Sequence, residues 1–390
     1  MPHSLCLITN AYPDFPDSNR VVFIRNCAQL LARRGWNVSV VAPRVFSASK
    51  PREQEGAVDI RRFSSFLGDK LLVEYSRTPA LRLTGYMMAG VLAAVRCIRE
   101  RDCELIHAHW VVPAGLIAVI AGWICRKPVV VTAHGSDILV VTEYNSLIKR
   151  MVTFVLNHVD AVTSVADHLT ERINGMDVRT REILTFPMSV PTESFCAQGA
   201  VREEWKGKRV ILSNRSLYPV YNVELLIMAA PLILKEIPDA RIIIAGEGPE
   251  RERLISLAQQ AGVSGQVHFI GAVPHDEMPD YLRAASVYVS TALSDGASVS
   301  LLEAMACGTF PVVADIPANR EWIEEGTNGF LFSPKDKTAL AEKIVNSINQ
   351  SDLAAQAREL NPAIVEQRAQ WDLNIEKLTA LYAEMLEKRA

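Results

Sequence analysis

The chain contains 390 residues, which is too many for one ordinary hydrophobic core and fits two domains of about 150 to 200 residues each. Hydrophobic residues account for 49% of the chain and charged residues for 22%, a composition that excludes an intrinsically disordered protein. The formal net charge of −3 excludes a nucleic-acid-binding protein that relies on an excess of positive charge.

The cysteines and the apolar runs indicate the cellular compartment of the protein. The seven cysteines include no C-x-x-C pair, which favours a reducing compartment. The apolar run at residues 5–8 is shorter than the roughly 7–15 apolar residues of a signal peptide. The longest apolar run, residues 110–125, is interrupted by Pro113 and is shorter than the roughly 20 residues that a membrane-spanning helix needs. We therefore expect a cytoplasmic protein that is soluble or peripherally attached to the inner face of a membrane.

The first half of the chain alternates strands and helices. The hydrophobic pattern predicts strands at residues 5–9, 38–42, 105–108, 129–132 and 161–164, and helices at residues 22–34, 81–99 and 116–123. Such alternation favours right-handed βαβ units and a parallel sheet that is covered by helices on both faces.

The pattern lapses at residues 187–194, PMSVPTES, and then resumes. Prolines and hydroxyl residues predict a hinge there. The second half contains predicted strands at residues 209–213, 240–245, 267–271, 285–291 and 310–314, and predicted helices at residues 223–236, 251–261, 278–285, 299–306 and 338–348. A last amphipathic stretch, residues 371–389, is also typical of a helix. We therefore expect an N-terminal domain at residues 1–190, a C-terminal domain at residues 191–370 and a terminal helical segment at residues 371–390.

Residues 294–308, SDGASVSLLEAMACG, join a predicted strand to a predicted helix through a turn of small residues. Gly296, Ala297 and Ser298 allow a ligand to approach the backbone. We expect the helix that begins at Val299 to end at Gly308, in the C′ position. That helix directs N–H groups and the positive end of its dipole at the turn. The stretch therefore predicts an anion site that suits a phosphate.

Two carboxylates flank the same turn. Glu303 lies about one turn inside the predicted helix. A carboxylate there repels a diphosphate but accepts hydrogen bonds from sugar hydroxyls. Asp295 lies on the loop, nearer to the reacting end of a bound donor. An ordinary helix with a cap-like aspartate and a solvated glutamate is the alternative interpretation.

Asp295 and Glu303 bracket seven residues, so the stretch resembles the E-x7-E signature of the family 4 glycosyltransferases, which are also described as glycosyl transferases group 1. Five further segments support the resemblance in chain order: AHG at 133–135, SNRS at 213–216, AGEGPE at 245–250, HFIGAVP at 268–274 and GTNGFLF at 326–332. The resemblance covers nearly the whole chain. It implies the α/β fold called GT-B, with two Rossmann-like doubly wound domains facing a central cleft and a C-terminal helix that crosses back to the first domain.

The resemblance implies roles for the second domain, which would bind the nucleotide sugar while the first binds the acceptor. Arg215 stands where the family has an arginine that grips the diphosphate. Six residues later the family has a lysine, but this chain has Tyr221, whose phenol donates a hydrogen bond and cannot neutralise charge. Gly246 and Gly248 would line the donor pocket, and Val273 would offer backbone groups to the base.

In the first domain the resemblance singles out His134, which follows a predicted strand and would lie against the sugar of the donor. A hydrogen-bonded structural histidine is the alternative. The catalytic candidates are thus His134, Asp295 and Arg215. The candidates for binding the donor are Glu303, Gly246, Gly248, Val273, Gly296, Ala297, Ser298, Val299 and Tyr221.

No metal is expected at this site. Glycosyltransferases that hold a metal on the donor diphosphate usually carry a D-x-D triplet, and this sequence has none. His107 and His109 would share one face of a strand, but no third ligand accompanies them. We therefore expect no cofactor besides a UDP- or GDP-linked sugar donor, and a metal-independent reaction. The resemblance implies retention of the anomeric configuration.

The leading interpretation is transfer of a hexosyl or N-acetylhexosaminyl group to a hydroxyl, with a saccharide or a lipid-linked saccharide as acceptor in the synthesis of a cell-surface polysaccharide. One alternative is a pseudo-enzyme that binds a nucleotide sugar, because Asp295 and Tyr221 depart from the family pattern and Ser18 and Asn19 replace a Gly-Gly pair. Another is a GT-B sugar-nucleotide epimerase or hydrolase, which uses water in place of an acceptor.

Residues 63–101 mix apolar and basic side chains, which suits peripheral contact with an anionic membrane. A Rossmann helix with a solvated basic face is the alternative. The apolar residues of this segment are Phe66, Leu71, Leu72, Tyr86, Met87 and Met88, and its cations are Lys70, Arg77, Arg82, Arg96, Arg99 and Arg101.

Overall fold

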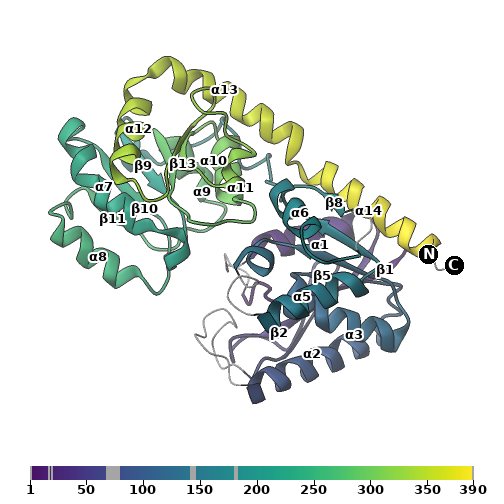
Figure 1. The fold of residues 1–390 in the computed structure, drawn as a ribbon. Coiled ribbons are helices and arrows are strands. Elements are labelled where there is room, and N and C mark those ends of the chain that lie inside the picture. Colours follow the sequence, from purple (N-terminus) through teal and green to yellow (C-terminus); the bar gives the residue numbers. More distant parts are fainter. Residues whose placement is uncertain are drawn as a thin grey trace. The chain divides into compact units, whose positions relative to one another are not determined.

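The computed structural model describes residues 2–15, 18, 21–66, 80–140, 146–179 and 183–388 (Figure 1). The chain divides into two compact units. Unit 1 comprises Met1–Pro187 and Trp371–Ala390, and unit 2 comprises Met188–Gln370. The sequence placed the corresponding boundaries after residues 190 and 370.

Unit 1 contains an eight-stranded sheet in the order β3-β4-β2-β1-β5-β6-β7-β8. All neighbouring strands are parallel except β3 and β4, which form an antiparallel edge. Residues Leu5–Ile8 of the central strand are fully buried, because helices cover both faces of a parallel sheet. The strands are β1 (Ser4–Thr9), β2 (Asn37–Arg44), β3 (Arg52–Glu55), β4 (Val58–Ser64), β5 (Leu105–His109), β6 (Val129–Ala133), β7 (Ala161–Ser164) and β8 (Ile183–Thr185).

The helices of unit 1 are α1 (Val22–Arg33), α2 (Ala80–Glu100), α3 (Leu116–Cys125), α5 (Ser146–His158), α6 (Asp167–Asn174) and α14 (Trp371–Glu387), with the short turns η2 (Val111–Gly115) and η3 (Ser136–Val140). Figure 1 shows α2, α3 and α5 side by side, and α2 and α5 both contact α3. By length and composition Leu81–Glu100 could cross a membrane. In the structure α2 covers β2 and β4 and buries Tyr86, Ala94, Cys97 and Ile98, which is the behaviour of a helix packed on a sheet.

The C-terminal helix α14 belongs to unit 1, far from the rest of that unit in sequence. It packs against α1, where Arg34 forms an ion pair with Asp372 at 2.7 Å. Tyr382 of α14 is fully buried, and its hydroxyl lies 2.6 Å from Nδ1 of His107 in β5. The apolar face of α14 thus completes the core of unit 1.

Unit 2 contains a six-stranded parallel sheet in the order β11-β10-β9-β12-β13-β14. Its strands are β9 (Val210–Ser213), β10 (Arg241–Ile244), β11 (Val267–Phe269), β12 (Val287–Ser290), β13 (Phe310–Ala314) and β14 (Phe330–Phe332). Its helices are α7 (Val223–Glu236), α8 (Arg251–Gln260), α9 (Met278–Ala284), α10 (Val299–Ala306), α11 (Pro317–Arg320), α12 (Lys337–Asn349) and α13 (Ser351–Arg368), with the short turns η4 (Glu203–Trp205) and η5 (Pro219–Tyr221).

The expected α/β class, with two Rossmann-like units built on mainly parallel sheets, is confirmed. Several elements were not predicted from the sequence: β3, β4, β8, β14, α5, α6, α11 and α13. Most of these strands lie at or next to a sheet edge, where an apolar run is short and its pattern weak. Helix α13 continues through Pro362, a residue that on sequence grounds usually ends a helix.

Candidate functional site

The turn between β12 and α10 forms at the place that the sequence predicts. Helix α10 begins at Val299 and ends at Ala306. Gly308 adopts a φ of +72° after the end of the helix, and its N–H donates to the carbonyl of Met305 at 3.0 Å. This left-handed residue closes the helix, so the predicted role of Gly308 is confirmed.

Arg215 lies two residues beyond the end of β9 and bonds to this turn. Its Nη2 donates to the carboxylate of Asp295 at 2.6 Å. Its Nη1 donates to the hydroxyls of Ser298 at 3.1 Å and Ser300 at 2.6 Å. Tyr288 of β12 donates to the same Ser300 hydroxyl at 2.9 Å. The structure therefore brings Arg215 to the turn that carries Asp295 and Ser298, at the N-terminus of α10. The sequence singled out all three residues.

Arg215 is only 8% exposed, and its charge is compensated within this cluster. Burial disfavours the charged guanidinium, but the charge and hydrogen bond of Asp295 together with Tyr221 and Tyr288 outweigh burial, so the pKa of Arg215 lies above its ordinary value. The Nε atom of Arg215 is buried and has no hydrogen-bond partner among the described residues. The site thus holds a permanent cation with one unused donor.

Tyr221, at the position where the family has a lysine, supports this cation. The guanidinium carbon of Arg215 lies 4.2 Å from the centre of the Tyr221 ring. A cation over an aromatic face is stabilised by about 0.5–2 kcal/mol. Tyr221 therefore helps to hold the Arg215 guanidinium and adds no second positive charge.

Glu303, in the middle of α10, is 6% exposed and bonded to a histidine that the sequence analysis did not single out. The Nε2 atom of His275 lies 2.8 Å from Oε1 of Glu303. The imidazole of His275 packs on Phe195 with ring centres 4.9 Å apart. One carboxylate oxygen of Glu303 is therefore engaged within the protein, and the second oxygen is the one that can accept a further hydrogen bond.

Gly246 and Gly248 follow β10 and pack against the loop that carries Arg215. A Cβ at Gly246 would lie 2.2 Å from the carbonyl oxygen of Arg215, and a Cβ at Gly248 would lie 2.4 Å from that of Leu217. The N–H of Leu217 donates to the carbonyl of Glu247 at 2.9 Å. The glycines thus permit a close approach of two backbones, which positions the Arg215 loop.

The remaining donor-binding candidates surround these contacts. Gly296 and Ala297 form the loop before α10, and the N–H of Val299 donates to the Ala297 carbonyl at 3.0 Å. The side chain of Val273 is buried in the core of unit 2, so only its backbone is suited to a ligand. The Ser18 and Asn19 positions lie in unit 1, and Asn19 is outside the described residues.

His134 lies in unit 1, one residue after β6, and is held by aromatic neighbours. Its ring centre is 4.6 Å from that of Trp110 and 5.4 Å from that of Phe23. Its Nε2 lies 2.9 Å from Nδ1 of His109. Burial lowers the pKa of His109 to about 3, and burial together with His109 lowers the pKa of His134 well below its ordinary value. Both rings are therefore neutral at neutral pH, and one proton is shared between them.

The loop that carries His134 is held by a buried carboxylate. Asp137 accepts hydrogen bonds from the N–H groups of Val111 at 2.7 Å, His134 at 3.2 Å and Gly135 at 3.0 Å. Burial raises the pKa of Asp137 to about 6, although these N–H groups favour the charged form. Asp137 therefore fixes the backbone of His134.

His107 and His109 have different partners, although both lie in β5. His107 lies between the hydroxyls of Tyr382 at 2.6 Å and Thr132 at 2.7 Å, and is fully buried. His109 contacts His134, and its Nε2 is buried with no partner among the described residues. His107 is thus a structural residue, while His109 reaches the candidate site of unit 1.

Sequence reasoning missed the partners of the candidates, namely His275, Ser300, Tyr288 and the pairing of His109 with His134. His275 stands only one residue after the GAVP segment, so its nearness to a recognised segment was the available signal. Nothing in the sequence distinguishes Ser300 from other helix residues.

Two family models match this chain and together span most of it. Glycosyltransferase Family 4 matches residues 21–194, and Glycosyl transferases group 1 matches residues 200–362. The chain belongs to the family 4 glycosyltransferases, and it is a glycosyltransferase.

Curated relatives carry names of the same class. The putative teichuronic acid biosynthesis glycosyltransferase TuaC of Bacillus subtilis is 24% identical over 86% of this chain and 87% of its own length. The N-acetyl-alpha-D-glucosaminyl L-malate synthase of Bacillus anthracis is 22% identical over 69% of this chain and 71% of its own length. The phosphatidyl-myo-inositol mannosyltransferase of Mycolicibacterium smegmatis is 27% identical over 66% of this chain and 65% of its own length.

Solved structures share the fold. Sucrose-phosphate synthase from Thermosynechococcus elongatus superposes with a TM-score of 0.83 over 99% of this chain and 100% of that chain, at 17% identity. Anabaena HepE in complex with UDP-glucose superposes with a TM-score of 0.76 over 99% of both chains, at 18% identity. These likenesses establish the GT-B fold for this chain.

Proposed function

We propose that this chain transfers a hexosyl or N-acetylhexosaminyl group from a UDP- or GDP-linked donor to a hydroxyl of a saccharide or lipid-linked acceptor, with retention of configuration and without a metal. The observation that carries the proposal is the buried Arg215 cluster at the N-terminus of α10. A permanent cation beside a helix N-terminus and flanking hydroxyls is suited to the negative charge of a leaving diphosphate.

In this proposal each candidate has one task. Arg215 binds the diphosphate and stabilises the charge that grows on it as the glycosidic bond breaks. The free oxygen of Glu303 accepts a hydrogen bond from a ribose hydroxyl, while His275 orients the carboxylate. His134 contacts the sugar through Nδ1, because its Nε2 is engaged by His109.

Retention follows from attack on the face that the diphosphate leaves. The acceptor oxygen forms a bond to the anomeric carbon, the bond from that carbon to the diphosphate oxygen breaks, and the proton of the acceptor hydroxyl passes to the departing phosphate oxygen. Asp295 is engaged by Arg215 at 2.6 Å, which favours a positioning role for this carboxylate over that of a covalent nucleophile.

The names of the relatives support the substrate class. They include a teichuronic acid glycosyltransferase and a mannosyltransferase that acts on a phosphatidylinositol. For this chain we propose an acceptor in cell-surface glycan synthesis, a cytoplasmic location and peripheral contact with the inner face of the membrane.

Purified protein and a panel of UDP-, GDP- and ADP-sugars test the proposal. A matching donor at about 100 times its Kd stabilises the folded state by roughly 2.7 kcal/mol, which a thermal-shift assay detects. Incubation with candidate acceptors follows, and NMR of the product reports the anomeric configuration. Donor binding without turnover on any acceptor would identify a pseudo-enzyme. Donor hydrolysis or epimerisation at the same rate with and without acceptor would identify the sugar-nucleotide alternative, and an inverted product would refute retention.

A further inference from the structure

Helices α2, α3 and α5 of unit 1 expose an unusual share of the large apolar side chains of this protein. Fourteen such side chains are exposed among the described residues, and seven of them lie on these three helices. Leu81 is 84% exposed, Leu92 is 67% exposed and Leu147 is 61% exposed. The full set is Leu81, Met88, Leu92, Trp123, Ile124, Leu147 and Phe154, and we call it the apolar set of the α2–α3–α5 face.

These side chains share one layer of unit 1. Helix α3 packs against both α2 and α5, and the rings of Trp123 in α3 and Phe154 in α5 lie 5.9 Å apart. Helices α2 and α3 bury their other sides against the sheet, and α5 packs against η2 and α3, so the exposed residues point away from these contacts. Exposed large apolar side chains that gather on one layer of a protein favour an interaction site there.

The three helices of this face carry positive charge with almost no acid. Residues 80–100, 116–127 and 146–158 contain seven Lys and Arg residues against one acid, Glu100. That acid is engaged by Arg52, Arg61 and Arg96. The cations are Arg82, Arg96, Arg99, Arg126, Lys127, Lys149 and Arg150.

Charge is also segregated between the two units. Unit 1 contains 25 Lys and Arg against 21 Asp and Glu, whereas unit 2 contains 16 against 23. The basic face therefore lies on the basic unit of an acidic chain. An anionic surface attracts this unit and repels the other, which orients the protein.

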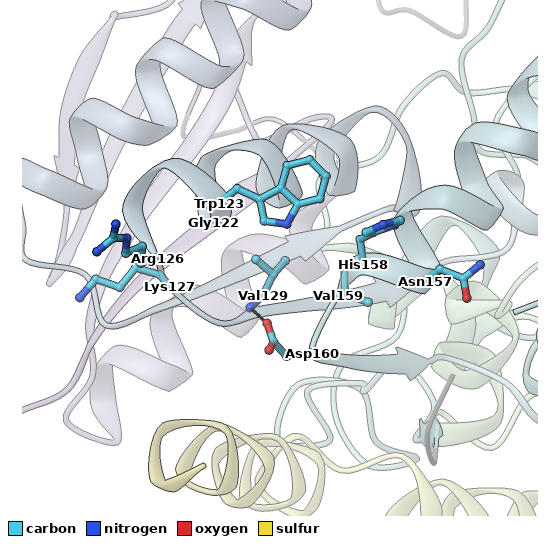
Figure 2. A pocket seen from close by; sticks show the side chains of 9 residues that line it. All are labelled: Gly122, Trp123, Arg126, Lys127, Val129, Asn157, His158, Val159 and Asp160. Carbon is cyan, nitrogen blue, oxygen red and sulfur yellow. Dashed lines mark hydrogen bonds between the residues drawn. The ribbon is translucent and has the colours of Figure 1, made fainter. Parts of the chain in front are cut away.

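A surface pocket of about 360 Å³ lies between the C-terminal ends of α3 and α5. In Figure 2, Arg126 and Lys127 lie at one end of the pocket and Asn157 and His158 at the other, with Trp123 between them. Cations beside an exposed indole are the side chains that hold a protein at a lipid headgroup layer.

We propose that the α2–α3–α5 face is a docking surface for an anionic lipid bilayer, with the apolar set reaching the acyl boundary and the seven cations contacting headgroup phosphates. The excess of cations on this face complements an anionic bilayer, which favours a membrane over a second copy of the chain. A second copy of the same face would place seven cations against seven cations, which opposes self-association. The proposal deepens the peripheral membrane contact named under the proposed function and depends on that contact.

The structure also corrects the membrane segment expected from sequence. Tyr86 is 2% exposed and packs on Phe63 with ring centres 5.1 Å apart, so neither side chain reaches a membrane. Arg101 is paired with Asp59 at 2.9 Å. Other members of that segment, Lys70, Leu71, Leu72 and Arg77, lie outside the described residues. Helices α3 and α5, distant in sequence, contribute further residues to the face proposed here.

Vesicle co-sedimentation with the full chain tests the proposal, using phosphatidylcholine vesicles with and without phosphatidylglycerol. We expect binding to the anionic vesicles at low salt, and weaker binding in high salt or without phosphatidylglycerol. The double variant Lys149→Glu/Arg150→Glu should lower the partition coefficient by at least about tenfold. Its control is Lys206→Glu/Lys208→Glu, which reverses two exposed charges of unit 2 and should leave binding unchanged.

Apolar contact is tested separately with Leu92→Ser/Leu147→Ser, which should weaken vesicle binding several-fold even at low salt. The control is Leu360→Ser/Leu373→Ser, two exposed leucines on other helices. All four leucines are exposed, so each variant should keep its melting temperature.

Three outcomes would overturn the proposal: no sedimentation with anionic vesicles at low salt, equal loss in the variants and their controls, or a concentration-dependent dimer that Leu92→Ser/Leu147→Ser dissociates. Nucleotide-sugar binding is measured on the same samples. A protein that binds donor and transfers sugar to a soluble acceptor, but does not bind vesicles, refutes only the docking surface. A protein that binds vesicles but no donor refutes the proposed function.

Discussion

The guanidinium of Arg215 donates to the carboxylate of Asp295 at 2.6 Å, although the two residues are 80 positions apart in the sequence. Both side chains are largely buried, so each is the main counter-charge of the other. A donor diphosphate that binds at Arg215 therefore enters a site whose cation is already held by a carboxylate. Under the proposed function, donor binding and the position of Asp295 are therefore coupled.

The Arg215–Asp295 pair should dominate the stability of this site. Asp295→Asn leaves a buried cation without its counter-charge, so we expect the free energy of unfolding to fall by about 3 kcal/mol. The double variant Arg215→Met/Asp295→Asn should lose less than the sum of the single variants, with a coupling energy of about 1.5–3 kcal/mol. Urea denaturation measures all three.

The matched control for that cycle is the exposed Arg320–Asp315 pair, whose charged atoms lie 2.5 Å apart. Asp315→Asn should cost less than about 1 kcal/mol, because solvent screens an exposed pair. An equal fall in the free energy of unfolding for Asp295→Asn and Asp315→Asn would show that burial does not make the Arg215–Asp295 pair more stabilising than an exposed pair.

Glu303 should control donor affinity. We expect Glu303→Ala to weaken binding of the nucleotide sugar at least about 30-fold, because a ribose hydroxyl loses its charged acceptor. His275→Ala should have a smaller effect, since it removes only the group that orients the carboxylate. Isothermal titration calorimetry measures both affinities, with Glu342→Ala on α12 as a control. An unchanged affinity in Glu303→Ala would remove this residue from the donor site.

The two glycines after β10 should act through backbone packing. A Cβ at Gly246 or Gly248 would overlap the Arg215 loop, so Gly246→Ala and Gly248→Ala should each lower the free energy of unfolding by about 1–3 kcal/mol. A Cβ at Gly265 would meet no atom within 4 Å, so Gly265→Ala is the control and should be nearly neutral. If Gly246→Ala and Gly248→Ala both kept the free energy of unfolding of the parent, the Arg215 loop would have moved to admit the added Cβ without a cost in stability.

Stability should fall at acidic pH because of three histidines of unit 1. The pKa values of His107, His109 and His134 are lowered in the folded protein by burial. The unfolded chain takes up protons near pH 6.5, whereas the folded chain does so only near the lowered values, about 3 for His109. Stability present above pH 6.5 is therefore lost as the pH falls, by up to about 1.4 kcal/mol per pH unit for each histidine.

Melting temperatures between pH 5 and 7.5 check this prediction. His109→Asn keeps a polar atom toward His134 but removes one titrating group, so its slope against pH should be shallower. Asp137 acts in the opposite sense, because its pKa is raised to about 6 and its contribution to stability grows as the pH falls through that value. A flat profile down to pH 5 would contradict the buried, neutral histidines.

Transfer activity should survive chelation. The proposed mechanism assigns leaving-group charge to Arg215 and the N-terminus of α10, so we expect an excess of EDTA to leave kcat within about twofold of its starting value. The assay is donor turnover in treated and untreated samples. Loss of activity that manganese or magnesium restores would assign the leaving-group charge to a metal instead.

The sequence by itself determined the local features. The strand, the turn of small residues, helix α10 and Gly308 were all predicted from neighbours in the chain, because hydrophobic period and helix-ending glycine are properties of short segments. The ordered segments also sufficed for the family, since their spacing reflects the repeated βαβ units of the fold.

Only the tertiary structure decided which side chains meet. Arg215 bonds to Asp295, His275 to Glu303 and His109 to His134. Each pair joins two segments that are distant in sequence but belong to the same unit. Exposure was decided in the same way. Tyr86 lies in an apolar helix and is buried, whereas Leu92 lies in the same helix and is exposed, because the sheet covers one side of α2 only. Contacts between distant segments depend on strand order and packing, which periodicity in one segment does not encode.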